Sequence, residues 1–200
     1  MKRIFVSFLL FCLISFSLQV KSFSYSTDPQ NFIAEIVDEA KIILNSSDSK
    51  EEKAEKLSII ALNTVDIKGI GYYTLGKKRK EISPEKLKNY EELFEKYFLK
   101  SFTSRLTDYS DPKISVLSAE KVNEKYTIVK TMLVKTDKKP EVKIDWRVYT
   151  KNPEKPLIRD LIIEGLSLAR TQKEEFTSIL NSNNDDIEFL ISTLTEFINK

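Results

Sequence analysis

The sequence predicts an α+β domain in which helices pack against a four-stranded antiparallel meander sheet. Apolar residues recur at helical spacing before residue 107 and after residue 167, whereas the pattern changes to the strand period between residues 113 and 164. The links between the predicted strands are only a few residues long, and short links join antiparallel neighbours. Since helices lie on both sides of the strands in the chain, we expect them to cover the sheet.

The first 24 residues have the features of a secretory signal peptide. Residues 1–3 are a short cationic start, and Ser22-Phe23-Ser24 offers small residues for cleavage. Residues 4–18 are an apolar run of about 15 residues, short for the roughly 20 that a membrane-spanning helix needs. We therefore expect residues 25–200 to form one exported domain; an uncleaved membrane anchor is the alternative.

Composition restricts the chemistry of that domain. The chain has no histidine, and its one cysteine, Cys12, lies in the predicted leader. The commonest general base and the usual zinc and iron–sulfur ligand sets are thereby excluded, so we expect no metal site and no cofactor. Without the leader residues Lys2, Arg3 and Lys21, 29 basic residues face 30 acidic ones. This near-neutral balance gives no argument for nucleic-acid binding.

Three helices have recognisable starts. Asp28-Pro29 places a cap before a proline at the first helical position, and Ser49 with Glu52 fits a capping box. Ser83-Pro84 begins a long helix with an unusually aromatic face. That face carries Leu87, Tyr90, Phe94, Tyr97, Phe98, Phe102 and Leu106. We expect it to pack against the sheet.

The segment from residue 66 to residue 86 holds three of the four glycines: Gly69, Gly71 and Gly76. Such a concentration predicts a hinge or an irregular connection. The basic run Lys77-Lys78-Arg79-Lys80 follows. It is either a solvated loop or an electrostatic contact for anionic head groups or an acidic partner surface.

Strands are predicted at residues 113–122, 125–136, 141–151 and 157–164. The third alternates cleanly, with Val142, Ile144, Trp146 and Val148 on one face and polar residues on the other. On the second strand we assign the apolar face to Ile128, Met132 and Val134. Two helices follow the sheet, the first at about residues 168–180 and the second after Asp185.

The end of the fourth strand carries Glu164-Gly165-Leu166-Ser167. Gly165 permits a backbone conformation that other residues avoid, and Ser167 is suited to cap the next helix. Glu164 is expected to accept hydrogen bonds at the helix start. A hydrolase elbow is the competing interpretation, but no glycine follows the serine and no histidine exists to activate it. Glu164, Gly165 and Ser167 are therefore predicted to form a structural turn.

Several motifs resemble the toluene-tolerance (MlaC) family of periplasmic proteins. Residues 144–147 (IDWR) resemble its V-D-Y-R strand, and residues 159–167 (RDLIIEGLS) resemble its Y-D-V-x-I-E-G-V-S segment. Residues 175–180 (EFTSIL) resemble the helical Q-F-x-x-I-L that follows. The sequence departs from the pattern at Arg159, where the family has tyrosine, and before the fourth strand, where the usual tryptophan is missing.

This resemblance implies a non-catalytic periplasmic phospholipid carrier, with the sheet wrapped by the N- and C-terminal helices around a deep apolar pocket. The implied cargo is phospholipid. The implied partners are an inner-membrane ATP-driven lipid transporter with a ring of substrate-binding domains and an outer-membrane lipoprotein–porin complex, and a shuttle favours a monomer. The residues expected to line the pocket are Tyr73, Phe94, Tyr97, Phe98, Phe102, Met132, Val142, Ile144, Trp146, Val148, Leu161, Ile163, Leu166 and Phe176.

Two other functions remain open at this point. One is a small α+β enzyme that acts on an apolar ligand with Asp and Tyr residues as acid and base. Asp145 and Asp160 lie on neighbouring strands and are its candidate pair, although we expect them to pair instead with Arg147, Arg159 or lysines. The other is a structural or inhibitory envelope protein, which would have a filled core and no cavity.

Overall fold

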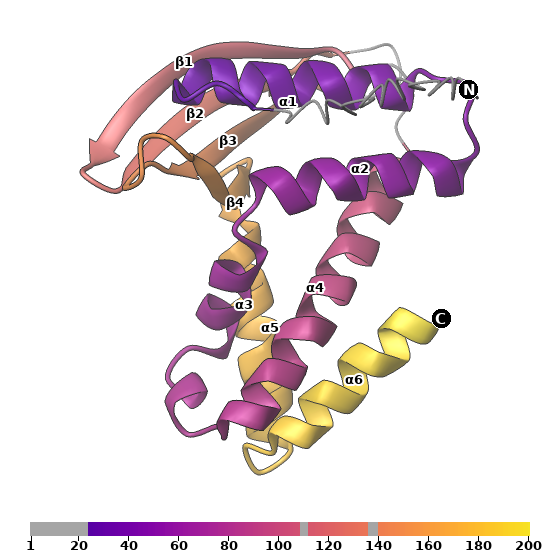
Figure 1. The fold of residues 1–200 in the computed structure, drawn as a ribbon, viewed down its shortest axis with the longest axis vertical. Helices are drawn as coiled ribbons and strands as arrows, with labels where there is room; N and C mark the ends of the chain where they lie inside the picture. Colours follow the sequence, from indigo (N-terminus) through magenta and orange to yellow (C-terminus); the bar gives the residue numbers. More distant parts are fainter. Residues whose placement is uncertain (1–23, 109–111, 136–139) are drawn as a thin grey trace, which may run out of the picture.

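The computed structural model describes residues 24–108, 112–135 and 140–200. The predicted leader lies outside these residues except for Ser24. Figure 1 shows the sheet and α1 together at one end of the molecule, α2 beside them, and α3, α4, α5 and α6 extending away. The α+β class is confirmed. The sheet with α1 and α2 forms one part of the molecule, and the remaining four helices form the adjoining part.

The first helices begin where the sequence predicts. α1 (Pro29–Leu44) has Asp28 as its N-cap, and α2 (Lys50–Thr64) begins with the capping box of Ser49 and Glu52. α4 (Pro84–Leu106) begins after Ser83, whose hydroxyl accepts from the Lys86 amide. Each cap occupies one of the amide groups that a helix start leaves without an internal partner.

The sheet has the predicted meander and one additional short strand. Its order is β1 (Ile114–Asn123), β2 (Tyr126–Leu133), β3 (Val142–Tyr149), β4 (Leu157–Ile163) and β5 (Leu166–Ser167), with every neighbouring pair antiparallel. Glu164 and Gly165 connect β4 to β5, and both have positive φ, 49° and 84°. Two consecutive positive φ angles are typical of a type I′ hairpin turn, so the chain reverses here and adds a fifth strand.

The predicted glycine hinge is wrong, because the part that holds Gly69 and Gly71 forms α3 (Ile67–Leu75). Asp66 caps this helix by accepting from the Gly69 amide at 2.9 Å. A Cβ atom on Gly71 would lie 2.8 Å from the Phe94 ring, so this glycine permits α3 and α4 to pack closely. Of the three glycines in this segment, only Gly76, with φ of 57°, needs glycine's conformational freedom, and it ends the helix. The 3₁₀ turn η1 (Lys78–Lys80) follows it.

The last two helices are antiparallel neighbours joined by a tight turn. α5 (Leu168–Ser182) is capped by Ser167, and α6 (Ile187–Asn199) by Asp186. Asn184 and Asp185 take left-handed φ angles of 55° and 60° between them. Asn and Asp tolerate this conformation better than other non-glycine residues, which explains how the turn forms without glycine.

The buried side chains form two separate cores. The sheet core joins α1 and α2 to the sheet through residues such as Phe32, Ile33, Val129 and Val148. The helical core joins α3, α4, α5 and α6. Contrary to expectation, the aromatic face of α4 packs mainly in the helical core and not on the sheet, because most of α4 lies within the bundle and only its C-terminal end reaches α2 (Figure 1).

A polar tie connects the two parts where α2 passes into α3. The Asp66 carboxylate lies 2.6 Å from the Arg159 guanidinium of β4, and the Asp66 amide donates to the Ile158 carbonyl at 2.9 Å. Val65 forms a parallel bridge with Ile158. Arg159 also donates to the Tyr126 hydroxyl and lies 3.6 Å above the Tyr149 ring.

Replacing Gly71 by valine is expected to destabilise the fold by about 1–3 kcal/mol, because the added atoms overlap the buried Phe94 ring. Urea denaturation measures the effect. The matched control is Glu92→Val on the exposed side of α4, which should cost only about 0.5 kcal/mol through helix propensity. Equal losses for both variants would show that α3 and α4 do not pack closely at Gly71.

Candidate functional site

The inner face of the sheet, the side that contributes to the sheet core, is incompletely covered. In register, Trp146 lies opposite Val129 and Val148 lies opposite Thr127. Val148 has no exposed surface, whereas Trp146 and Ile144 on the same face are only half-buried. Burial therefore decreases along β3, from the Val148 end toward the Val142 end.

The neighbouring strand continues this partly covered surface. Leu161 lies opposite Trp146 and Ile163 lies opposite Ile144, and both are half-buried. Ile158, at the other end of β4, is buried. We call the half-buried set the apolar patch; it consists of Val142, Ile144, Trp146, Leu161 and Ile163.

The middle of α4 lies at the junction between the two cores. Phe98 packs against the helical core, whereas Leu106, two turns later, packs against the sheet core. Phe102 lies between them, half-buried, with its ring stacked on Phe98 at 5.8 Å between centroids. Val65 packs against both cores. Half-buried apolar side chains thus connect the cores on the helix side as well.

A hollow of about 520 Å³ opens between the two cores beside Asp66, where α2 passes into α3. Phe32 of the sheet core, Ile67 of the helical core and Val65 contribute apolar walls, and Leu62 and Leu157 add to them. Charged side chains also line it, namely Asp66, Lys68, Glu95, Glu154 and Lys155. Its volume is in the range of small-molecule sites. None of the pocket residues predicted from the sequence lines this hollow.

Thr131 is a member of the inner face that sequence reasoning missed. Its hydroxyl accepts from the Trp146 indole at 3.0 Å and donates to the Ile144 carbonyl at 2.9 Å. The polar atoms of Thr131 and Trp146 are thereby satisfied while their apolar surfaces face inward. In the residues that the structure describes, no buried side-chain nitrogen or oxygen lacks a partner.

Met132 lies on the opposite, outer face of the sheet. It pairs with Lys143, whose side chain alternates with those of Ile144 and Val142. The predicted inward face of β2 is therefore wrong, because Ile128 and Met132 lie opposite Arg147 and Lys143 on the outer face. The β-branched residues at every second position, Thr127, Val129 and Thr131, were the available signal.

Other predicted pocket residues lie away from the apolar patch. Phe94 and Phe176 are each 2% exposed and meet edge to face inside the filled helical core. Tyr97 is half-buried there and donates to Gln172 at 2.8 Å. Tyr73 and Leu166 are 46% and 60% exposed on the surface. The structure thus brings together five of the predicted residues as the patch, with Phe98 and Phe102 at the junction.

The turn after β4 is a structural cap. Ser167 accepts from the Arg170 amide and donates to the buried Asp160 carboxylate at 2.6 Å. Asp160 also accepts from the Ala169 amide at 3.0 Å and lies 3.4 Å from Arg147, the pairing expected from the sequence. The Glu164 carboxylate accepts from the Lys143 amide of β3 and not from the helix start, contrary to expectation.

These contacts leave little basis for acid–base catalysis by Asp and Tyr residues. The Asp160 carboxylate is already occupied by three donors, and Asp145 lies opposite Lys130 on the neighbouring strand. Burial raises the pKa values of Tyr90 and Tyr97, which makes their phenolates still less accessible as bases than that of a free tyrosine. Within the described ranges, no three acidic side chains come together as a metal site.

A family model described as MlaC protein matches residues 34–196. This chain belongs to the MlaC family. Among solved structures, this MlaC-family chain is similar to a phospholipid-binding protein from Ralstonia solanacearum that was determined in complex with a phospholipid. The TM-score is 0.72 at 17% identity, over 85% of this chain and 96% of the other. At this identity the likeness establishes a common fold. No curated protein matches the sequence.

No helix within residues 24–108, 112–135 and 140–200 combines the length and the apolarity needed to cross a membrane.

Replacing Asp160 by alanine is expected to destabilise the protein by about 3 kcal/mol, because Arg147 and the start of α5 lose a buried anionic partner. Thermal and urea unfolding measure this loss. Asp145→Ala on the neighbouring strand is the control and should cost about 1 kcal/mol or less. If the two variants were equally stable, the Asp160 carboxylate would not anchor α5.

Proposed function

We propose that this protein is a non-catalytic phospholipid carrier that holds acyl chains against the apolar patch. The observation that carries this proposal is the incomplete burial of apolar side chains at one end of the sheet's inner face. Membership of the MlaC family, and a common fold with a protein determined in complex with a phospholipid, support it.

The energetic requirement for such a carrier is large. Two acyl chains of about 16 carbons each, at roughly 0.8 kcal/mol per methylene group, cost on the order of 25 kcal/mol to expose to water. A lining that shields them must be apolar and free of unpaired buried charge. The patch supplies aliphatic and indole surface, and its one side-chain donor, Trp146 Nε1, is already bonded to Thr131.

We infer that the acyl chains enter between the sheet core and the helical core. Trp146 of the patch and Phe98 and Phe102 of α4 are all half-buried, so none of these side chains is fully enclosed by either core. Interlocked cores resist separation, since close-packed side chains lose many contacts when they part. The half-covered junction is therefore the least costly place for acyl chains to enter.

We further infer that the carrier works in the periplasm as a monomer. The apolar run at residues 4–18 supports export. The partners that the family resemblance implies are an inner-membrane ATP-driven lipid transporter and an outer-membrane lipoprotein–porin complex, with phospholipid as the exchanged cargo.

Mass spectrometry of lipids extracted from protein purified out of a periplasm without detergent tests the carrier function. We expect about one phospholipid per chain, because one set of acyl chains fills one junction. A folded protein that is empty, and that takes up no lipid from vesicles, would contradict the proposal.

A pair of sheet variants tests the location of the cargo. Ile144→Asp places a charge in the apolar patch and should abolish lipid retention, because a buried carboxylate without a partner is unfavourable beside acyl chains. Met132→Asp changes a half-buried residue on the neighbouring strand but on the outer face, and it should retain lipid. If both folded variants retained phospholipid equally, the apolar patch would not be the place where the acyl chains bind.

Cleavage of the leader is tested by N-terminal sequencing of the periplasmic protein. We expect the mature chain to begin at Tyr25, after Ser22-Phe23-Ser24. Recovery of an intact Met1 in the membrane fraction would instead indicate an uncleaved anchor.

A further inference from the structure

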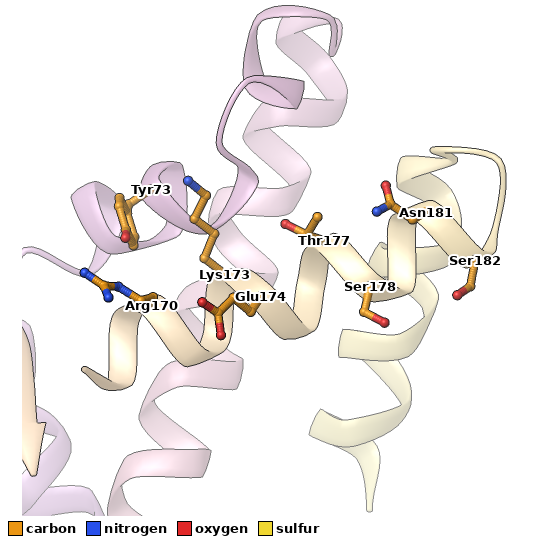
Figure 2. Close-up of a pocket in the computed structure, with 8 residues that line it drawn as sticks. All are labelled: Tyr73, Arg170, Lys173, Glu174, Thr177, Ser178, Asn181 and Ser182. Atoms are coloured by element: carbon orange, nitrogen blue, oxygen red, sulfur yellow. The ribbon is translucent and has the colours of Figure 1, made fainter. Parts of the chain in front are cut away.

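A second hollow, of about 670 Å³, lies on the surface of the helical bundle, away from the apolar patch. Tyr73 contributes to it from α3, and α5 contributes Arg170, Lys173, Glu174, Thr177, Ser178, Asn181 and Ser182. Figure 2 shows Tyr73 between the side chains of Arg170 and Lys173. The Lys173 ammonium lies 5.0 Å from the centre of the Tyr73 ring. Two cations thus flank an exposed aromatic side chain.

The basic run that follows α3 adjoins this hollow. Gly76 lies against Lys173, since a Cβ atom on it would be 3.3 Å from Lys173 Cε, and Lys77 is the next residue. Within the run, Lys78 pairs with Glu81 and Asp185, whereas Arg79 lies over the Tyr72 ring.

Among the cations of the basic run and of the hollow, five have no carboxylate within 4.0 Å in the part of the chain that the structure describes, and one of these, Arg79, lies over the Tyr72 ring. The other four are those that remain for an external anion. They are Lys77, Lys80, Arg170 and Lys173, which we call the basic face. Glu174 is the one acidic residue that lines the hollow. The surface is therefore cationic although the chain outside the leader is near neutral.

Helix electrostatics do not explain all of these cations. Lys77 and Lys80 follow the C-terminus of α3, where positive charge is favourable. Arg170, however, lies in the first turn of α5, where the helix dipole disfavours positive charge, and Lys173 lies one turn further along the same helix. A local arrangement that works against folding is typical of a functional surface.

We propose that the basic face docks this protein onto an anionic membrane surface by contacting phosphate head groups. The cations supply the attraction, and the Thr177 and Ser178 hydroxyls and the Asn181 amide supply neutral donors to phosphate oxygens. Tyr73, 46% exposed among them, is the amphipathic aromatic residue typical of membrane interfaces, which favours a lipid surface over an acidic protein. This inference rests on the proposed function, since exchange with complexes in two membranes brings a lipid carrier close to a lipid surface.

Vesicle flotation tests the docking. The full-length mature protein is mixed with vesicles of pure phosphatidylcholine, or with vesicles that contain phosphatidylglycerol, at low and at high salt. We expect binding to the anionic vesicles only, weakened by salt through screening. Replacing Lys77, Lys80, Arg170 and Lys173 by glutamine should remove it, and each single replacement should lower the partition coefficient about fivefold.

The matched control neutralises four exposed lysines elsewhere: Lys113, Lys125, Lys143 and Lys151. It changes the net charge equally and should still bind. Both quadruple variants should retain bound phospholipid, so a failure of docking is distinguished from a failure of the carrier function. The proposal would be overturned if the wild-type protein did not bind anionic vesicles, or if the basic-face variant bound them as well as the wild type does. An acidic protein would then be the candidate partner.

Discussion

The relation between the sheet and the helical bundle depends on Asp66. Its carboxylate caps α3 and pairs with Arg159 of β4, and its amide extends the edge of β4 by a hydrogen bond to Ile158. One residue thereby sets the start of a helix and the position of that helix against the sheet. Because the pair is partly shielded and hydrogen-bonded, it holds better than an exposed ion pair.

This tie has a consequence for where the molecule is able to accept a ligand. It lies at the Ile158 end of β4, whereas the apolar patch reaches Ile163 at the other end. Asp160 holds the start of α5 to the same strand, so polar contacts attach the bundle to β4 at two places beside a patch that is itself only half-buried. The acyl-chain site that we propose on the patch therefore lies at the other end of β4 from the Asp66 contacts.

Features that depend on neighbouring residues in the chain could be predicted from the sequence. Features that depend on contacts between residues far apart in the chain could not. The caps at Asp28, Ser49 and Ser83 were predictable because each acts within its own helix turn. Gly71 was misinterpreted because its role depends on Phe94 of another helix. The alternating apolar face of β3 was readable, but how far helices cover that face was not, since the direction of α4 decides it.

Arg159 shows how a departure from the family pattern is accommodated by its surroundings. An arginine at this position brings a charge into a partly buried place, where it is unfavourable unless it is paired. Asp66 supplies the opposite charge, the Tyr126 hydroxyl accepts a further hydrogen bond, and the Tyr149 ring stacks on the guanidinium plane. The charge of Arg159 is therefore paired, and the pair connects β4 to the start of α3.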